Sequence, residues 1–104
     1  MSRQRIIELN EALGRRPEHE FALYALAMEH ASLGELERAL ELFEQLVRTH
    51  PNYVPAYQQY ASVLARLRRY DRMRTVLQSG LVHAQEHGQF HARDKMRDML
   101  SQLP

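Results

Sequence analysis

A chain of 104 residues, of which 44% are hydrophobic and 26% charged, has the size and composition of one ordinary globular domain, residues 1–104. It contains no cysteine, which excludes disulfide bonds, thiolate metal sites and cysteine nucleophiles. Its 14 basic and 13 acidic side chains leave a formal net charge of +1, so the domain as a whole has no strong attraction for nucleic acid.

The N-terminal segment predicts a short amphipathic helix over residues 3–14, with Ile6, Leu9 and Leu13 on one stripe. The same segment lacks the continuous apolar core of a signal peptide. No apolar run in the sequence reaches the about 18 residues of a membrane-spanning helix. From these patterns we expect a soluble, cytoplasmic protein that does not bind membranes.

The stretch from Phe21 to Pro51 predicts two helices joined by a short turn at Gly34. The first helix is apolar on nearly all sides, which indicates packing neighbours on more than one side. The second helix places Ala39 and Phe43 on one apolar stripe, and its glutamates lie mostly outside that stripe. It ends before Pro51, because the residue preceding a proline avoids the helical conformation. Two helices with so short a connection must lie antiparallel.

The segment after Pro51 repeats this layout with helices predicted at 53–67 and about 70–86. Asn52 is a good N-cap residue for the first of them. Arg68 stands in the turn where the first helix pair has a glycine, which leaves the geometry of that turn open. Gly80, inside the second helix, predicts close approach of a neighbouring backbone. The last predicted helix, residues 89–102, is the obvious neighbour.

An offset of 34 residues relates the two helix pairs. It places Leu26 on Tyr60, Ala27 on Ala61, Phe43 on Leu77, and Pro17 on Pro51. The first pair shows Leu23-x₂-Leu26-Ala27-x₂-His30, then Ala39-x₃-Phe43, then Pro51. In these residues and this period the chain resembles the tetratricopeptide repeat family. The resemblance implies an all-α, right-handed α-α superhelix of about six helices. Repeats at 18–51 and 52–86 would be capped by helices 3–14 and 89–102.

The resemblance also implies a binding surface, because in this family the first helix of each repeat lines a concave groove that holds an extended or helical peptide. The lining residues would be Phe21, Tyr24, Ala25 and Met28 from the first repeat, Gln58, Gln59, Ser62 and Arg66 from the second, and Gln89, Arg93 and Met96 from the last helix. One end is apolar and aromatic, and the other offers amide and guanidinium donors. Such a surface suits a segment with an apolar anchor and an acidic or backbone-rich portion.

Two other interpretations of these residues bear on the partner. Phe21, Tyr24 and Met28 could instead pack against the N-terminal helix as core. In addition, one subclass of the family grips the acidic C-terminal tail of chaperones through a clamp of lysines, asparagines and an arginine. The matching positions here hold Tyr24, Met28, Gln59, Gln89 and Arg93, of which only the arginine agrees. We therefore do not expect chaperone-tail binding of that kind.

The charges are segregated along the chain. Residues 18–51 hold seven acids against two arginines, whereas residues 52–104 hold eight bases against four acids. Five of those bases are arginines around the turn at Arg68, and arginine suits phosphate. Tyr70 is the one aromatic in this cluster, so we do not expect nucleic acid to bind. Opposite charge on the two halves would favour head-to-tail association, and we expect a monomer or a weak homo-oligomer.

The histidines and acids provide weak signals for catalysis or metal binding. His83 and His87 are four residues apart, but a zinc site needs a third ligand, which would have to come across the turn at Gly88. The sequence has no H-E-x-x-H, G-x-S-x-G, phosphate-loop or G-x-G-x-x-G motif. Asp94 and Asp98 have basic neighbours, which favours ion pairs. We therefore expect no enzymatic activity, no catalytic residue, no metal and no other cofactor.

These observations favour a non-catalytic scaffold or adaptor for protein–protein interaction, which binds another protein or a peptide in the concave groove. The alternative is a homo-oligomerisation module that uses the same surface. Two repeats fall short of the three that are usually needed for stability. Either the caps supply the missing surface, or a second chain does.

Overall fold

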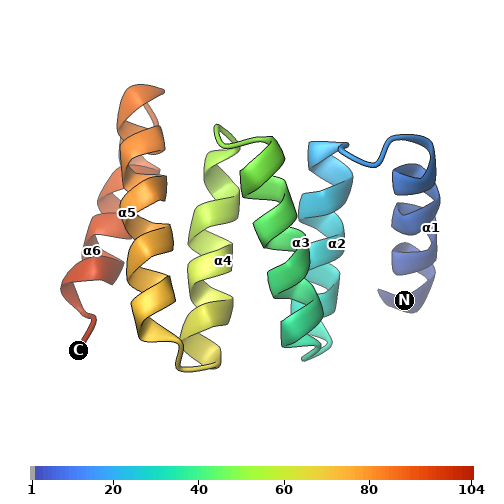
Figure 1. The fold of residues 1–104 in the computed structure, drawn as a ribbon, viewed down its shortest axis with the longest axis horizontal. Coiled ribbons are helices and arrows are strands. Elements are labelled where there is room, and N and C mark those ends of the chain that lie inside the picture. The colour runs from blue at the N-terminus through green and yellow to red at the C-terminus, as the bar shows by residue number, and fades with distance from the viewer. Residues whose placement is uncertain (1) are drawn as a thin grey trace.

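The computed structural model describes residues 2–104, so Met1 of the expected domain lies outside the described residues. It contains six α-helices in that range: α1 (Ser2–Arg15), α2 (Glu20–Ser32), α3 (Leu36–Thr49), α4 (Val54–Arg66), α5 (Tyr70–Glu86) and α6 (Phe90–Ser101). They follow one another in chain order along the molecule, with the two termini at opposite ends (Figure 1). The fold is the all-α helical repeat that the sequence predicted.

The helices form two layers. Each helix contacts its neighbours in the chain, and in addition α2 contacts α4 and α4 contacts α6. Within residues 2–104, no Cα atom of α3 lies within 8 Å of one in α1 or α5. We call α2, α4 and α6 the inner layer and α1, α3 and α5 the outer layer. Because the inner helices are closer together than the outer ones, the array curves towards its inner layer.

The 34-residue period is visible in the burial of equivalent positions. Leu26 of α2 and Tyr60 of α4 are both buried, as are Ala27 and Ala61. Phe43 of α3 and its equivalent Leu77 of α5 are fully buried. Equivalent residues of the two hairpins therefore occupy equivalent places in one continuous core, as the repeat predicts.

The two turns within the repeats share one geometry. Gly34 has φ 78° and Arg68, 34 residues later, has φ 58°. The N–H of each donates to the carbonyl three residues earlier, Ala31 at 3.0 Å and Ala65 at 3.0 Å. The sequence left the geometry of the second turn open. The structure shows that Arg68 adopts the left-handed backbone conformation, which glycine adopts without steric strain.

The predicted role of Asn52 is wrong. Helix α4 begins at Val54, and its N-cap residue is Tyr53, whose side chain makes no capping hydrogen bond. The Oδ1 atom of Asn52 lies instead 3.1 Å from Nδ1 of His83 on α5. A tertiary contact across 31 residues has replaced the local cap.

Gly80 lies where three helices meet, and the atoms nearest to its Cβ position belong to side chains, not to the neighbouring backbone that the sequence predicted. A Cβ atom at this position would lie 2.5 Å from Cβ of Tyr57 on α4 and 2.7 Å from Sδ of Met96 on α6. Tyr57 and Met96 are both buried, so neither side chain can move into solvent to make room. The expected neighbour α6 is present, and α4 comes closer still.

We predict that Gly80→Ala lowers the free energy of unfolding by about 1–3 kcal/mol, because the added methyl group overpacks this junction. Urea unfolding followed by circular dichroism measures the change. Gly14→Ala in α1 is the matched control, since nothing lies within 4 Å of its Cβ position. Alanine there should leave stability unchanged or raise it by up to about 1 kcal/mol. Equal stability of Gly80→Ala and wild type would contradict the close packing.

Candidate functional site

The residues predicted to line a groove lie on the inner layer, on α2, α4 and α6, with Gln89 as the N-cap residue of α6. The structure brings four of them together around one hollow of about 220 Å³ between α2 and α4. We call this the inner hollow. Its lining consists of Met28, Ala31, Ser32, Gln59, Ser62, Val63 and Arg66.

Three residues of this lining were not predicted from the sequence, namely Ala31, Ser32 and Val63. Ala31 and Ser32 follow Met28 by three and four residues, so they share its helix face one turn further on. Helical spacing from Met28 could therefore have found them. Val63 adjoins Ser62 in the chain, and the sequence pattern does not distinguish such an apolar residue from a core residue. In the structure Val63 is buried and still lines the hollow.

Most polar groups of the inner hollow come from α4, and α2 adds the hydroxyl of Ser32, which donates to the carbonyl of Glu29 at 3.1 Å. Arg66 is the one charged residue of the hollow, and its Nη1 atom donates to the carbonyl of Ala31 at 3.2 Å. The hydroxyl of Ser62 donates to the carbonyl of Gln58 at 3.1 Å. The guanidinium thus keeps donors besides the one directed at α2, and the half-exposed side chain of Gln59 adds an amide. The hollow combines apolar side chains from α2 with hydrogen-bond donors from α4.

Phe21 and Tyr24 lie towards the N-terminus of α2, and neither is fully buried. Phe21 is 56% exposed. Tyr24 is half-buried, and its ring packs against Phe43 of α3 at 6.4 Å and against Tyr53 at 5.3 Å between ring centroids. The aromatic neighbours of Tyr24 therefore come from α3 and from the N-terminal end of α4.

At the other end of the array, the predicted lining from α6 does not join the inner hollow. Met96 is fully buried beside Gly80, so it belongs to the core, and Ala25 of α2 is buried as well. Arg93 donates from Nη1 to Oε1 of Gln85 on α5 at 2.7 Å, and its guanidinium lies 4.8 Å from the ring centre of Phe90. Its hydrogen bonds are thus made within the domain.

Partial burial raises the pKa values of Tyr24 and Tyr53, which lie at the apolar end of the predicted groove. Loss of solvent raises the pKa of Tyr24 above its usual 10.0, and the neighbouring Tyr53 phenol adds to the shift. Burial also raises the pKa of Tyr53, with a smaller contribution from the carboxylate of Glu20. Both phenols are therefore neutral at physiological pH and can serve as hydrogen-bond donors.

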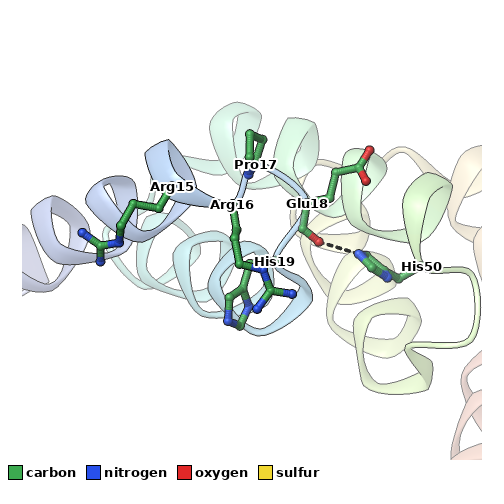
Figure 2. A pocket seen from close by; sticks show the side chains of 6 residues that line it. All are labelled: Arg15, Arg16, Pro17, Glu18, His19 and His50. Atoms are coloured by element: carbon green, nitrogen blue, oxygen red, sulfur yellow. Dashed lines mark hydrogen bonds between the residues drawn. The ribbon is translucent and has the colours of Figure 1, made fainter.

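A larger hollow of about 510 Å³ lies beside the linker between α1 and α2, and none of the predicted groove residues lines it. Figure 2 shows its lining side chains, with Arg15 extending away from His50. A ring nitrogen of His50, at the end of α3, is hydrogen-bonded to the carbonyl oxygen of Glu18. His19 accepts from the backbone N–H of Ala22 as the N-cap of α2. These contacts fix the linker to the α2–α3 hairpin, so a structural role accounts for them.

The arginine cluster of the second turn is engaged within the chain. Arg69 pairs with Glu37, and Arg72 contacts Glu44 at 2.6 Å and the phenol oxygen of Tyr60 at 2.7 Å. Hydrogen bonds to Tyr60 and Glu44 raise the pKa of Arg72 above its usual value. The acids of the first repeat thus neutralise bases of the second inside one molecule. This weakens the charge argument for head-to-tail association.

Two observations bear on other functional classes. Among residues 3–104, no aspartate, glutamate, histidine, lysine or arginine is buried. No helix within the described residues is long and apolar enough to cross a membrane.

Comparisons with known proteins agree with the geometry. A sequence model described as "Tetratricopeptide repeat" matches residues 20–63, which span α2, α3 and most of α4. A solution structure of a tetratricopeptide repeat domain protein from Salinibacter ruber is 37% identical, with a TM-score of 0.76, and the match covers 81% of this chain and 85% of that one. A crystal structure of such a domain protein from the same organism is 36% identical, with a TM-score of 0.73, and covers 78% and 91%.

A more distant structural match is the TPR2B domain of yeast Sti1, solved as a pHsp70 complex. It has a TM-score of 0.85, is 18% identical, and covers 92% of this chain and 77% of that one. At that identity the likeness shows the fold alone. No curated protein matches this sequence.

We predict that the free energy of unfolding falls as the pH rises above about 10, because the half-buried phenols of Tyr24 and Tyr53 bind their protons more tightly in the folded state than in the unfolded chain. This stabilisation is complete below the unfolded-state pKa and is lost as the pH passes the raised folded-state values. Urea unfolding between about pH 9 and pH 11 measures the slope. Tyr24→Phe with Tyr53→Phe should make it shallower. An unchanged slope in the double variant would contradict the assignment.

Proposed function

Because this chain belongs to the tetratricopeptide repeat family, whose fold is a non-enzymatic protein-interaction fold, we propose that it is an adaptor that holds a peptide or a partner helix along its inner layer. The observation that carries this proposal is the inner hollow. Four of the residues that the family resemblance implies meet there, and among residues 3–104 no side chain of the terminal helices α1 and α6 lines it.

The lining defines the kind of segment that would fit. Met28, Ala31 and Val63 offer an apolar wall for one aliphatic or aromatic side chain. Arg66 and Gln59 offer donors for a carboxylate or for backbone carbonyls. We therefore propose a short segment with an apolar anchor next to an aspartate or glutamate. The exposed ring of Phe21 provides further apolar contact for a longer ligand.

The likeness to yeast Sti1 does not extend this proposal to chaperone tails. Those Sti1 structures are described as pHsp70 and pHSP90 complexes, but they share 18% identity with this chain. Of the clamp positions, only Arg93 carries a matching residue, and its guanidinium is bonded to Gln85 and Asp94. A ligand anchored in the inner hollow fits the residues better.

We expect a random peptide library displayed on phage to yield binders in which an apolar residue adjoins an acidic one. Gln59→Ala with Arg66→Ala should weaken the selected peptides at least about tenfold, since charge-assisted hydrogen bonds are lost. Fluorescence anisotropy of a labelled selected peptide measures the affinity.

Gln78→Ala with Arg48→Ala is the matched control, because it removes the same residue types from exposed positions on the outer layer. Its affinity should equal that of the wild type, and circular dichroism should show the same helicity for all three proteins. A library that yields no binder, or binders that the hollow variant holds as tightly as the wild type, would overturn the proposal.

A homo-oligomeric role is the second candidate, and exposed apolar side chains favour it. Ile7 on the outermost helix α1 is 54% exposed, and Val82 on α5 is 51% exposed. A hollow of about 450 Å³ near the C-terminus is lined largely by apolar residues, Tyr70, Met73, Met99 and Leu103 among them. End-to-end stacking of two copies would bury such surfaces as a further repeat does.

If this second role holds, the mass from sedimentation equilibrium should rise with protein concentration between about 1 and about 500 µM. Ile7→Lys should return the chain to a monomer, because a charge would then lie in the contact. The double variant Gln59→Ala with Arg66→Ala, which changes the inner hollow, should self-associate like the wild type. A monomeric mass across the series would exclude self-association in this range.

A further inference from the structure

We propose that α5 carries a binding site for a divalent transition-metal ion, best suited to Zn²⁺, formed by His83, Glu86 and His87. One ligand atom of each residue lies within 4.8 Å of the other two. In the described part of the chain this is the one group of three or more such side chains gathered so closely. It lies near the C-terminal end of α5, and none of its residues lines the inner hollow.

Helix geometry brings the three side chains together. Residues three and four apart lie one turn along the same side of a helix, so Glu86 and His87 both come next to His83. Two Zn–N bonds of about 2.0 Å and a Zn–O bond of about 2.1 Å place the ligand atoms of a tetrahedral ion about 3.3 Å apart. Glu86 and His87 are exposed, so rotation of their side chains can close the remaining gap.

The hydrogen bonds of both rings favour metal binding. Nδ1 of His87 lies 2.9 Å from the backbone carbonyl of His83, which can only accept, so this nitrogen carries the proton. Nδ1 of His83 lies 3.1 Å from Oδ1 of Asn52, an acceptor as well. In a neutral imidazole the lone pair is then on Nε2. Metal-binding histidines are oriented in this way, with the other ring nitrogen donating to an oxygen.

Stacking also restricts the two rings. The ring of His83 lies against Tyr57, with centroids 5.6 Å apart and an angle of 16° between the planes. The ring of His87 stacks on that of His83 at 6.5 Å and 24°. Because Tyr57 is buried in the core, it gives His83 a rigid support. Less conformational freedom is then lost when an ion binds.

The donor set selects the class of ion. Two imidazoles and one carboxylate suit Zn²⁺ and similar transition ions, whereas Mg²⁺ and Ca²⁺ prefer oxygen ligands alone. Three protein ligands leave at least one coordination position open to water or to a donor from a second molecule. From the sequence, a third ligand was expected only from beyond Gly88, but the third residue of the group is Glu86, inside the same helix.

The test is a titration of the tag-free full chain with ZnCl₂, in which isothermal titration calorimetry measures the heat of binding. We expect one ion to bind with a dissociation constant below about 100 µM. His87→Ala should weaken binding at least about tenfold, and Asn52→Ala, which removes the acceptor that orients His83, should weaken it by about 10-fold or more. MgCl₂ should give no signal. His87 and Asn52 are exposed, so neither change disturbs the core.

His91→Ala is the matched control, since it removes an exposed histidine that is not part of the cluster. It should bind Zn²⁺ like the wild type. The proposal is overturned if the wild type takes up no Zn²⁺ in this range, or if His87→Ala binds it as tightly as the wild type. Because no ligand of the ion lines the inner hollow, peptide binding by the same variants reports separately on the adaptor function.

Discussion

Phe43 joins the two helical hairpins, and the fold depends on this contact. Its ring is fully buried on α3, lies edge-on to Tyr24 of α2, and stacks on Tyr60 of α4 with centroids 6.0 Å apart. Three consecutive helices therefore share one aromatic cluster, and aromatic pairs of this kind contribute beyond the area they bury. A helical hairpin cannot cover its own apolar face, so this shared cluster aligns one repeat on the next.

The curvature of the array follows from how each layer is spaced. Inner helices approach one another, since α2 contacts α4 and α4 contacts α6, and the outer helix α5 packs on this layer so tightly at Gly80 that no methyl group fits there. Outer helices are too far apart for backbone contact, so long side chains bridge them, as Arg69 and Arg72 of the second repeat do to Glu37 and Glu44 of the first. The inner hollow and the ion pairs between the outer helices are thus two consequences of one geometry.

The resemblance to the tetratricopeptide repeat family predicted the lining of the inner hollow only in part. Met28, Gln59, Ser62 and Arg66 were found because the register of the repeat places them on one side of the first helix of each pair. Met96 was assigned to the same surface, but it is core, because its side chain is fully buried with the sulfur atom against Gly80 of α5. The apolar pattern of a single helix does not determine which neighbouring helix each of its faces packs against. In the described structure no further repeat packs on α6 to define which of its faces belongs to the inner surface.

The sequence by itself determined the fold class, the six helices and the two repeats, because periodicity, turn residues and prolines act through local backbone geometry that needs no distant partner. Tertiary structure alone decided the contacts between residues far apart in the chain. The local pattern predicted that Asn52 caps a helix, whereas tertiary packing places Asn52 against His83. Tertiary packing also pairs acids of the first repeat with arginines of the second within one molecule. It also left the space between α2 and α4 open. Such outcomes depend on the spacing and rotation of packed helices, which short-range patterns do not encode.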